Sequence, residues 1–197
     1  MKNINKIENQ VLYMQETAYN IINELKIVET WKKIGAKVNL VGSLKMGLLV
    51  KHKDIDFHIY TEELNPDLAF SIINEFKKSP KVKNVEYINL SDKEDCCLEF
   101  HLFFEDDNSQ IWQIDMINIK NGSRYDGHFE KIAEKIIKQM TEEQKQIIWN
   151  LKYQTPETEK IHGMEYYKAV IQDNIKTFDE FLGWRKSHKF SGIIEWE

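Results

Sequence analysis

Cysteine is scarce in this sequence, and the two residues present, Cys96 and Cys97, are adjacent. Neighbouring cysteines rarely reach the geometry of a normal disulfide, so no structural disulfide is expected between them. Two thiols also supply too few ligands for a metal site of their own, which favours packing in a strand or in the core. A chain without a disulfide framework suits a reducing compartment, and we expect a cytoplasmic protein.

Long apolar runs and an excess of positive charge are also missing. No stretch approaches the roughly 20 apolar residues of a membrane helix, and residues 1–6 predict an amphipathic helix rather than a signal peptide. The 27 Lys and Arg against 32 Asp and Glu give a net charge of −5. Because binding to long nucleic acids depends on clustered Lys and Arg, we expect a small-molecule or protein partner instead.

Proline is rare and stands where helices are predicted to begin or end. Asn65-Pro66-Asp67 is a helix start, with Asn as the cap, Pro at the first position and Asp near the positive end of the dipole. Apolar residues at three- and four-residue steps predict further helices. Thr141 with Gln144 and Thr177 with Glu180 predict capping boxes at the start of two of them. The helical segments are residues 4–34 (one helix or two), 44–50, 66–78, 129–140, 142–154, 166–175 and 178–184.

Alternating and apolar patterns predict strands between these helices. The polar turn 106–109 joins the last two strands into an antiparallel hairpin. The strands are residues 37–41, 55–60, 85–90, 97–105 and 110–119. The sequence thus predicts an α/β (α+β) protein. Residues 1–120 would form the core with its N-terminal helix, and residues 121–197 a helical region that is a candidate for binding an acceptor.

The most informative motif is a Gly-Ser pair followed by two acids on one strand. Gly42-Ser43 comes directly after the predicted strand 37–41, and Asp54 and Asp56 begin the next strand. Side chains alternate across a strand, so the two carboxylates point to one face and Ile55 to the opposite, buried face. Such neighbours repel each other unless a cation lies between them. Hard divalent cations such as Mg²⁺ bind carboxylate oxygens together with substrate phosphates, so the motif indicates metal-assisted phosphate chemistry.

A third acid, Asp115, lies in the predicted strand 110–119. Its face is mixed, with Gln113 polar but Ile111 and Ile117 apolar. A carboxylate buried among apolar neighbours needs a partner, and a metal ion would serve. The alternative is that this end of the strand is exposed.

The ordered set of these residues resembles the nucleotidyltransferase superfamily, which includes DNA polymerase beta, the antibiotic nucleotidyltransferases and the minimal bacterial nucleotidyltransferases. The resemblance covers residues 38–119. It implies a mixed β-sheet core, Mg²⁺ or Mn²⁺, and a nucleoside triphosphate substrate, with ATP the expected donor. The residues that match the family pattern are Gly42, Ser43, Gly47, Asp54, Asp56 and Asp115.

The resemblance also implies a role for each acid. Asp54 and Asp56 would bridge the metal ions, and Asp115 would bind the metal nearer the acceptor and help to deprotonate its hydroxyl. Two metals can stabilise both the attacking and the leaving oxygens of an in-line displacement. Each acid taken alone could instead be a solvated strand residue.

The turn residues would hold the triphosphate. Gly42 lets the backbone approach the phosphates, while the Ser43 hydroxyl and the first N–H groups of the following helix bind phosphate oxygens. Gly47 would keep that helix close to the sheet, and Lys45 is the nearest lysine that could add positive charge.

Histidines allow a second interpretation of the same segment. His52 and His58 flank the acid pair, and imidazole with carboxylate suits Zn, Fe or Mn. A rise of about 3.3 Å per residue puts the two histidines roughly 20 Å apart, too far to share one ion. His58 is better explained as a polar neighbour of the site, which Glu99 and His101 on strand 97–105 could also face.

The predicted function is metal-dependent transfer of a nucleoside monophosphate, with AMP from ATP expected, to a hydroxyl of a small molecule or a protein. The acceptor could be an antibiotic or a toxin side chain. Arg124 and Tyr125 are candidates for an acceptor wall, although aromatic residues of the helical region could simply form its core. The alternative function is a catalytically silent domain that binds nucleotide or a protein partner.

Overall fold

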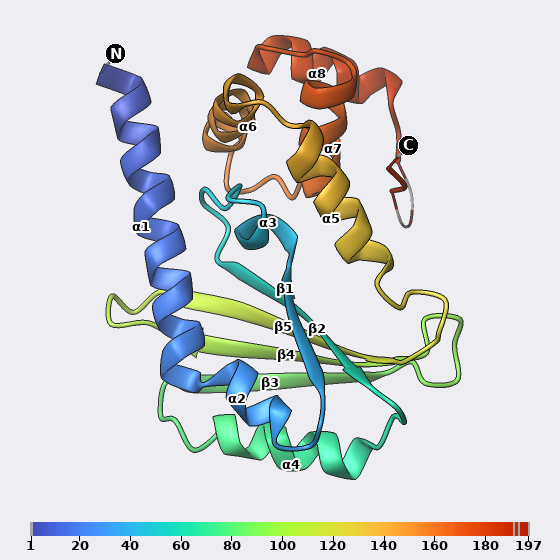
Figure 1. The fold of residues 1–197 in the computed structure, drawn as a ribbon. Helices are drawn as coiled ribbons and strands as arrows, with labels where there is room; N and C mark the ends of the chain where they lie inside the picture. The colour runs from blue at the N-terminus through green and yellow to red at the C-terminus, as the bar shows by residue number, and fades with distance from the viewer. Residues whose placement is uncertain (1, 191, 193, 197) are drawn as a thin grey trace.

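A five-stranded mixed β-sheet forms the centre of the protein (Figure 1). The computed structural model describes residues 2–190, 192 and 194–196. The strand order is β1-β2-β5-β4-β3; β2 and β5 are parallel, and the other neighbours are antiparallel. The strands are β1 (Lys37–Val41), β2 (Asp54–Thr61), β3 (Val82–Asn89), β4 (Cys97–Glu105) and β5 (Ile111–Lys120).

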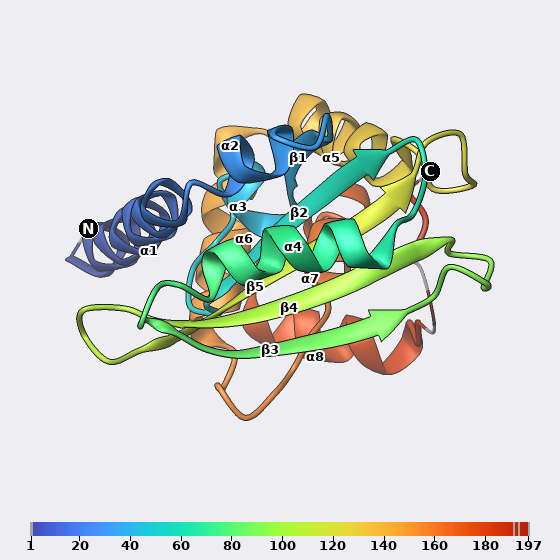
Figure 2. The same cartoon turned by 90° about the horizontal axis from the view of Figure 1, so that it is seen from below.

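The first helices and α4 pack on one face of this sheet (Figure 2). They are α1 (Lys2–Leu25), α2 (Ile27–Lys32) and α4 (Pro66–Phe76). Their apolar side chains, Trp31 of α2 among them, share one core with inward residues of the strands such as Phe57 and Phe100. The N-terminal periodicity yields two helices because Lys26 adopts a left-handed conformation with φ of 51° between them. Asn65 caps α4 as predicted, because its side chain accepts from the Leu68 N–H at 3.0 Å.

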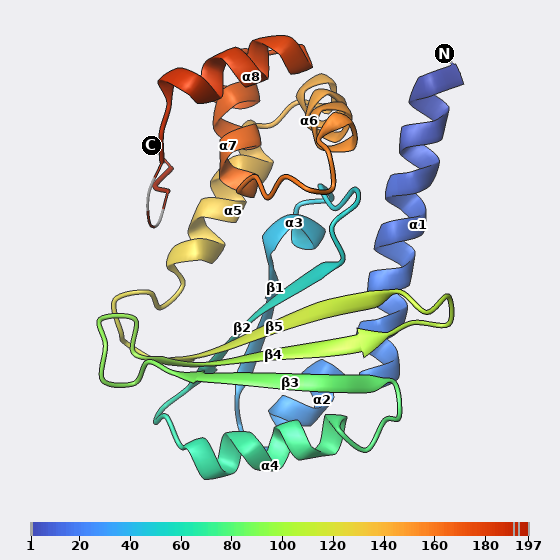
Figure 3. The same ribbon diagram turned by 180° about the vertical axis from the view of Figure 1, so that it is seen from behind.

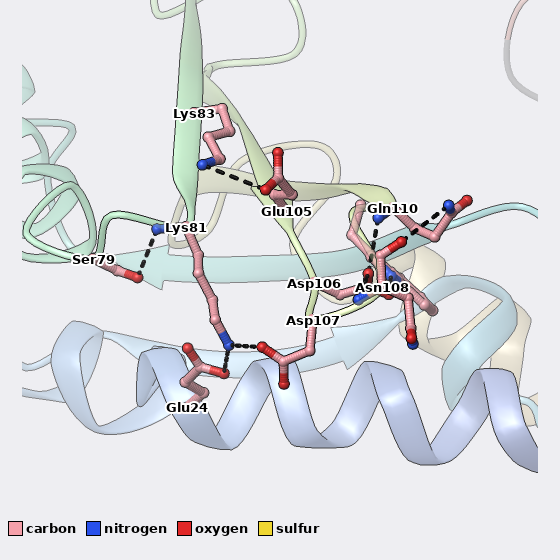
Figure 4. A network of polar contacts seen from close by, with 10 residues as sticks. Glu24, Ser79, Lys81, Lys83, Glu105, Asp106, Asp107, Asn108 and Gln110 are labelled. Atoms are coloured by element: carbon pink, nitrogen blue, oxygen red, sulfur yellow. Dashed lines mark hydrogen bonds and ion pairs between the residues drawn. The ribbon is translucent and has the colours of Figure 1, made fainter.

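A polar network attaches the end of α1 to the sheet (Figure 4). Lys81, just before β3, lies 3.0 Å from Glu24 of α1 and 2.8 Å from Asp107 in the β4–β5 turn. In the same turn Asp106 accepts from the backbone N–H of Gln110 at 2.8 Å. Exposed ion pairs contribute about 0–1 kcal/mol each, so this network aligns segments more than it stabilises them.

The remaining helices form a second core beside the sheet (Figure 3). They are α5 (His128–Gln139), α6 (Glu142–Gln154), α7 (Gly163–Tyr167) with a π-helical continuation (Lys168–Gln172), and α8 (Phe178–Ser187). The predicted capping boxes at Thr141 and Thr177 are both present. Met46 and Leu48, from the segment after β1, are buried in this second core and join it to the sheet.

The structure confirms the predicted α/β class, the β4–β5 hairpin and the strand 37–41. The helix predicted over 44–50 is wrong, because α3 (Gly42–Lys45) begins earlier and ends at Lys45. Gly47 has a φ of 71°, and the backbone closes a turn there instead of continuing the helix. Neither cysteine is in a disulfide. Within the described residues, no helix is both long and apolar enough to cross a membrane.

Candidate active site

A cavity of about 660 Å³ lies between the sheet and the helical region. The acids Asp54 and Asp56 of β2 and Asp115 of β5 line its sheet side. Tyr166 and Tyr167 of α7 line its helical side. The structure therefore brings the three predicted acids to one cavity, together with aromatic residues from the far end of the chain.

Strand register explains why the acids converge. Asp56 and Asp115 are direct partners in the parallel β2–β5 ladder, where neighbouring strands run about 4.8 Å apart. Asp54 is two residues before Asp56 on the same face, opposite Gln113. The intervening Ile55 is fully buried on the other face, as the alternation predicted.

Charge repulsion and burial act together on this cluster. Burial of its carboxylate, followed by the charges of Asp115 and Asp54, raises the pKa of Asp56 to about 7. Burial also raises the pKa of the more exposed Asp54, and His52 partly opposes this shift. The metal-free protein therefore holds its negative charges here at an energetic cost, which a bound cation would relieve.

Gly42 allows the Asp56 carboxylate to lie directly against the turn. A Cβ added at Gly42 would lie 1.9 Å from Asp56 Oδ2, and the backbone φ of 67° also disfavours a side chain. Ser43, the next residue, lines the cavity. The absence of a side chain at Gly42 thus has a physical reason, namely the close approach of an acid to the backbone.

Two other predicted site residues, Gly47 and Lys45, do not line this cavity. A Cβ added at Gly47 would lie 3.5 Å from Lys145 Cε of α6. The Gly47 carbonyl accepts a hydrogen bond from Trp149 Nε1 of the same helix at 2.8 Å. Gly47 therefore brings the turn against α6 rather than holding α3 to the sheet. Lys45 is exposed and lines a separate groove between β1 and α5, away from the acids.

Lys152 of α6 is a cation of the cavity that sequence analysis missed. Its Nζ donates to the Leu48 carbonyl at 3.0 Å and to the Tyr167 hydroxyl at 3.1 Å. Burial of the amine lowers its pKa to about 8, although Asp56 and Asp54 favour the charged form. One signal was present in the sequence: Lys152 lies four residues after the buried Ile148, on the apolar face of its helix.

Both histidines beside the acid pair line the cavity. His58 lies on the same strand face as the acids, 3.4 Å from Glu130, and its ring packs edge-on against Phe129 with centroids 5.3 Å apart. It is thus a polar neighbour of the acids, as predicted. His101 and Glu99 also lie on this side, and His101 Nδ1 is 2.6 Å from Asp115 Oδ1.

The donor set suits a hard divalent cation that also binds phosphate. Across the part of the chain that the structure describes, no three His, Cys, Asp or Glu side chains gather closely enough to hold an ion by themselves. Mg²⁺ is usually bound by one or two carboxylates together with waters and substrate phosphates, not by an all-protein cage. Three carboxylates that line an open cavity and destabilise one another fit that mode of binding.

The acceptor-wall candidates Arg124 and Tyr125 lie away from the cavity lining. Arg124 forms an ion pair with Glu94 in the β3–β4 loop. Tyr125 is buried and packs against Phe129, with ring centroids 5.6 Å apart. The aromatic residues on the cavity wall are instead Phe129, Tyr166 and Tyr167.

Comparison with known proteins supports the fold. No protein-family model matches the sequence, and no curated protein is significantly similar to it. Among solved structures, Cid1 poly(U) polymerase with bound MgGTP matches with a TM-score of 0.56 and 14% identity, over 80% of this chain and 49% of that chain. The GLD-2–GLD-3 poly(A) polymerase complex matches with a TM-score of 0.57 and 11% identity, over 86% of this chain and 56% of that chain.

The chain thus shares its fold with these polymerase structures, and this is the kind of mixed-sheet α/β fold that its motif predicted. The similar structures also include a cytoplasmic RNA terminal U-transferase. It matches with a TM-score of 0.50 and 15% identity, over 80% of this chain and 52% of that chain. The chain spans about half the length of the Cid1 structure.

Proposed function

We propose that the protein is a metal-dependent nucleotidyltransferase that moves AMP from ATP to a hydroxyl of a small molecule or a protein. The observation that carries the proposal is the meeting of Asp54, Asp56 and Asp115 in one cavity, with Asp56 and Asp115 in register on adjacent strands. A solvated strand face would not give Asp56 a pKa of about 7 through burial and like charge.

The triphosphate would lie between the turn after β1 and α6. Ser43 at the cavity wall supplies a hydroxyl donor, and the bare backbone at Gly42 leaves room for a close approach. Lys152 supplies positive charge from the opposite side. Its contacts with the Leu48 carbonyl and the Tyr167 hydroxyl hold the amine at the cavity before any substrate binds.

The acids would organise the transfer itself. Asp54 and Asp56 would hold Mg²⁺ or Mn²⁺ against the triphosphate, and Asp115 would lie nearer the acceptor. A divalent ion bound there supplies positive charge for the in-line displacement at the α-phosphorus. Asp115 would accept or orient the proton of the acceptor hydroxyl, and pyrophosphate would leave on the side of Lys152.

The composition of the cavity favours a small or protein acceptor. Its wall includes apolar side chains of α5 and α7, and Ile194 of the C-terminal segment also lines it. The net charge of −5 offers no general attraction for a polyanion. An RNA 3′ end is the second candidate acceptor, because the similar structures include a poly(U) polymerase and a poly(A) polymerase complex.

Incubating the purified protein with each α-³²P-labelled triphosphate, Mg²⁺ and a panel of acceptors tests the proposal. The panel should include hydroxyl-bearing antibiotics, candidate partner proteins and a short oligoribonucleotide. We expect label transfer from ATP to a non-nucleic-acid acceptor, and loss of transfer in Asp115→Asn. Extension of the oligoribonucleotide alone would make RNA the acceptor.

A silent nucleotide-binding domain would give a different result. It would bind ATP with metal, measured by calorimetry, yet transfer label to no acceptor and release no pyrophosphate. Absence of metal-dependent ATP binding would remove the nucleotidyltransferase proposal altogether.

A further inference from the structure

Two side-chain donors converge on a single oxygen of Asp115. His101 of β4 is the direct cross-strand partner of Asp115, and its Nδ1 lies 2.6 Å from Asp115 Oδ1. Gln113, two residues before Asp115 on β5, donates its Nε2–H to the same oxygen at 2.9 Å. Because an ionised carboxylate only accepts hydrogen bonds, the His101 Nδ1 atom must carry the proton in this contact.

This arrangement leaves the other oxygen, Oδ2, for a different partner. The side chains of His101 and Asp115 are 17% and 23% exposed, so the contact is mostly shielded from water. Asp115 lines the cavity but His101 does not, so His101 reaches the site only through Asp115. Residues that hydrogen-bond a ligating carboxylate fix its orientation, and their loss typically costs about 10–100-fold in metal affinity or activity.

Holding the sheet together is the simpler role for such a contact. The β4–β5 ladder, however, already pairs nine residues on each strand, from Cys97 opposite Ile119 to Glu105 opposite Ile111. Leu98, Phe100 and Leu102 on the other face of β4 are fully buried in the main core. Backbone pairing and apolar burial therefore account for the cohesion of these strands, and the His101 contact adds little to it.

We propose that His101 is a positioning residue for nucleotidyl transfer, which holds Asp115 Oδ1 so that Oδ2 faces the metal and acceptor. The inference rests on the proposed function. It extends the site to β4, outside the Gly-Ser turn and the three acids. Glu99, whose Oε2 lies 3.7 Å from His101 Nε2, flanks the other side of the ring.

Three variants test the proposal. His101→Leu removes the donor, and His101→Asn places an amide donor close to the former position of Nδ1. Glu99→Gln is the matched control, because it changes the other neighbour of the ring without touching Asp115. The first measurement is Mn²⁺ binding in the presence of a non-hydrolysable ATP analogue, followed by electron paramagnetic resonance. The second is ¹⁵N NMR of the histidine rings in the metal-free protein.

We expect His101→Leu to weaken the binding of the Mn²⁺ ion that Asp115 would hold, the one nearer the acceptor, about tenfold or more. His101→Asn should recover most of this loss, and Glu99→Gln should bind like wild type. In the metal-free wild type, Nδ1 of His101 should carry a proton, and its signal should shift in Asp115→Asn. Melting temperatures of the metal-free variants should stay close to that of wild type.

Unchanged Mn²⁺ binding in His101→Leu would overturn the positioning role while leaving the proposed function in place. Equal losses in the Leu and Asn variants would overturn it too, because a donor at that position would then be irrelevant. If wild type itself bound no Mn²⁺ with the ATP analogue, the proposed function would fail, and the role of His101 would fail with it. Should His101→Leu not fold, the ¹⁵N spectrum of wild type decides, because a His101 Nδ1 without a proton cannot donate to Asp115 and would overturn the proposal.

Discussion

Removing one charge from the acid cluster should stabilise the metal-free protein. Asp56 has its pKa raised from 3.8 to about 7, chiefly by burial and then by the charges of Asp115 and Asp54. Between these two values the folded protein holds a proton that the unfolded chain has lost, so stability falls as the pH rises. Above about pH 7 both states are ionised, and the penalty levels off at up to about 4 kcal/mol, at roughly 1.4 kcal/mol per pKa unit.

Asp56→Asn keeps the shape of the side chain and removes this penalty. Relative to wild type in EDTA, we expect the variant to gain up to about 4 kcal/mol near pH 8.5 but only about 2 kcal/mol near pH 5. For a chain of this size, the larger gain corresponds to a rise in melting temperature of roughly 10 °C. Glu86→Gln, which removes an exposed charge on β3, is the matched control and should melt like wild type.

Added Mg²⁺ and ATP should reduce the stability advantage of Asp56→Asn over wild type. Wild type should gain about 2.7 kcal/mol at ligand concentrations 100-fold above the dissociation constant, and Asp56→Asn should gain much less. Calorimetric scans at both pH values, with and without ligand, measure all of these quantities. Melting temperatures of wild type and Asp56→Asn that agree at both pH values would refute the proposed crowding of charge.

Three further predictions concern the surroundings of the acids. Gly42→Ala should destabilise the fold by about 1–3 kcal/mol in urea titrations. The backbone φ of 67° disfavours a side chain, and the added Cβ would lie 1.9 Å from Asp56 Oδ2. Lys152→Met should weaken ATP binding by calorimetry at least tenfold, the cost of a lost charged hydrogen bond, whereas Lys145→Met on the same helix should not. Burial opposes ionisation of Glu130, but the His58 ring 3.4 Å away and hydrogen bonds from Asn39 and Tyr60 lower its pKa to about 2. Wild type should therefore lose about 1–2 kcal/mol relative to Glu130→Gln as the pH falls from 4.5 toward 2, after allowance for solvent screening.

Local rules were sufficient for the strands that carry the acids. Alternation alone predicted that Asp54 and Asp56 share a face and that Ile55 is buried, because neighbouring side chains on any strand point in opposite directions. The capping boxes and the β4–β5 hairpin were equally local. The pairing of Asp115 with Asp56 was not predicted, since a parallel ladder joins segments far apart in the chain; only the family resemblance had placed both acids at one site.

The helical side of the cavity could not be predicted in the same way. Lys152 and Tyr167 reach the acids because α6 and α7 dock on the turn after β1. No local pattern encodes such docking, which depends on the packing of a second core. Lys45 was chosen for its closeness in sequence to the Gly-Ser turn, but its side chain lines a different groove.

The late position of Lys152 in the chain has a consequence for synthesis on the ribosome. All three acids have been translated by residue 115, but the amine that opposes their charge comes 37 residues later, on α6. A nascent sheet would therefore carry its repulsion unopposed until the helical region emerges and folds. During that interval Mg²⁺ and the proposed nucleotide substrate would stabilise the same carboxylates that Lys152 stabilises in the finished protein.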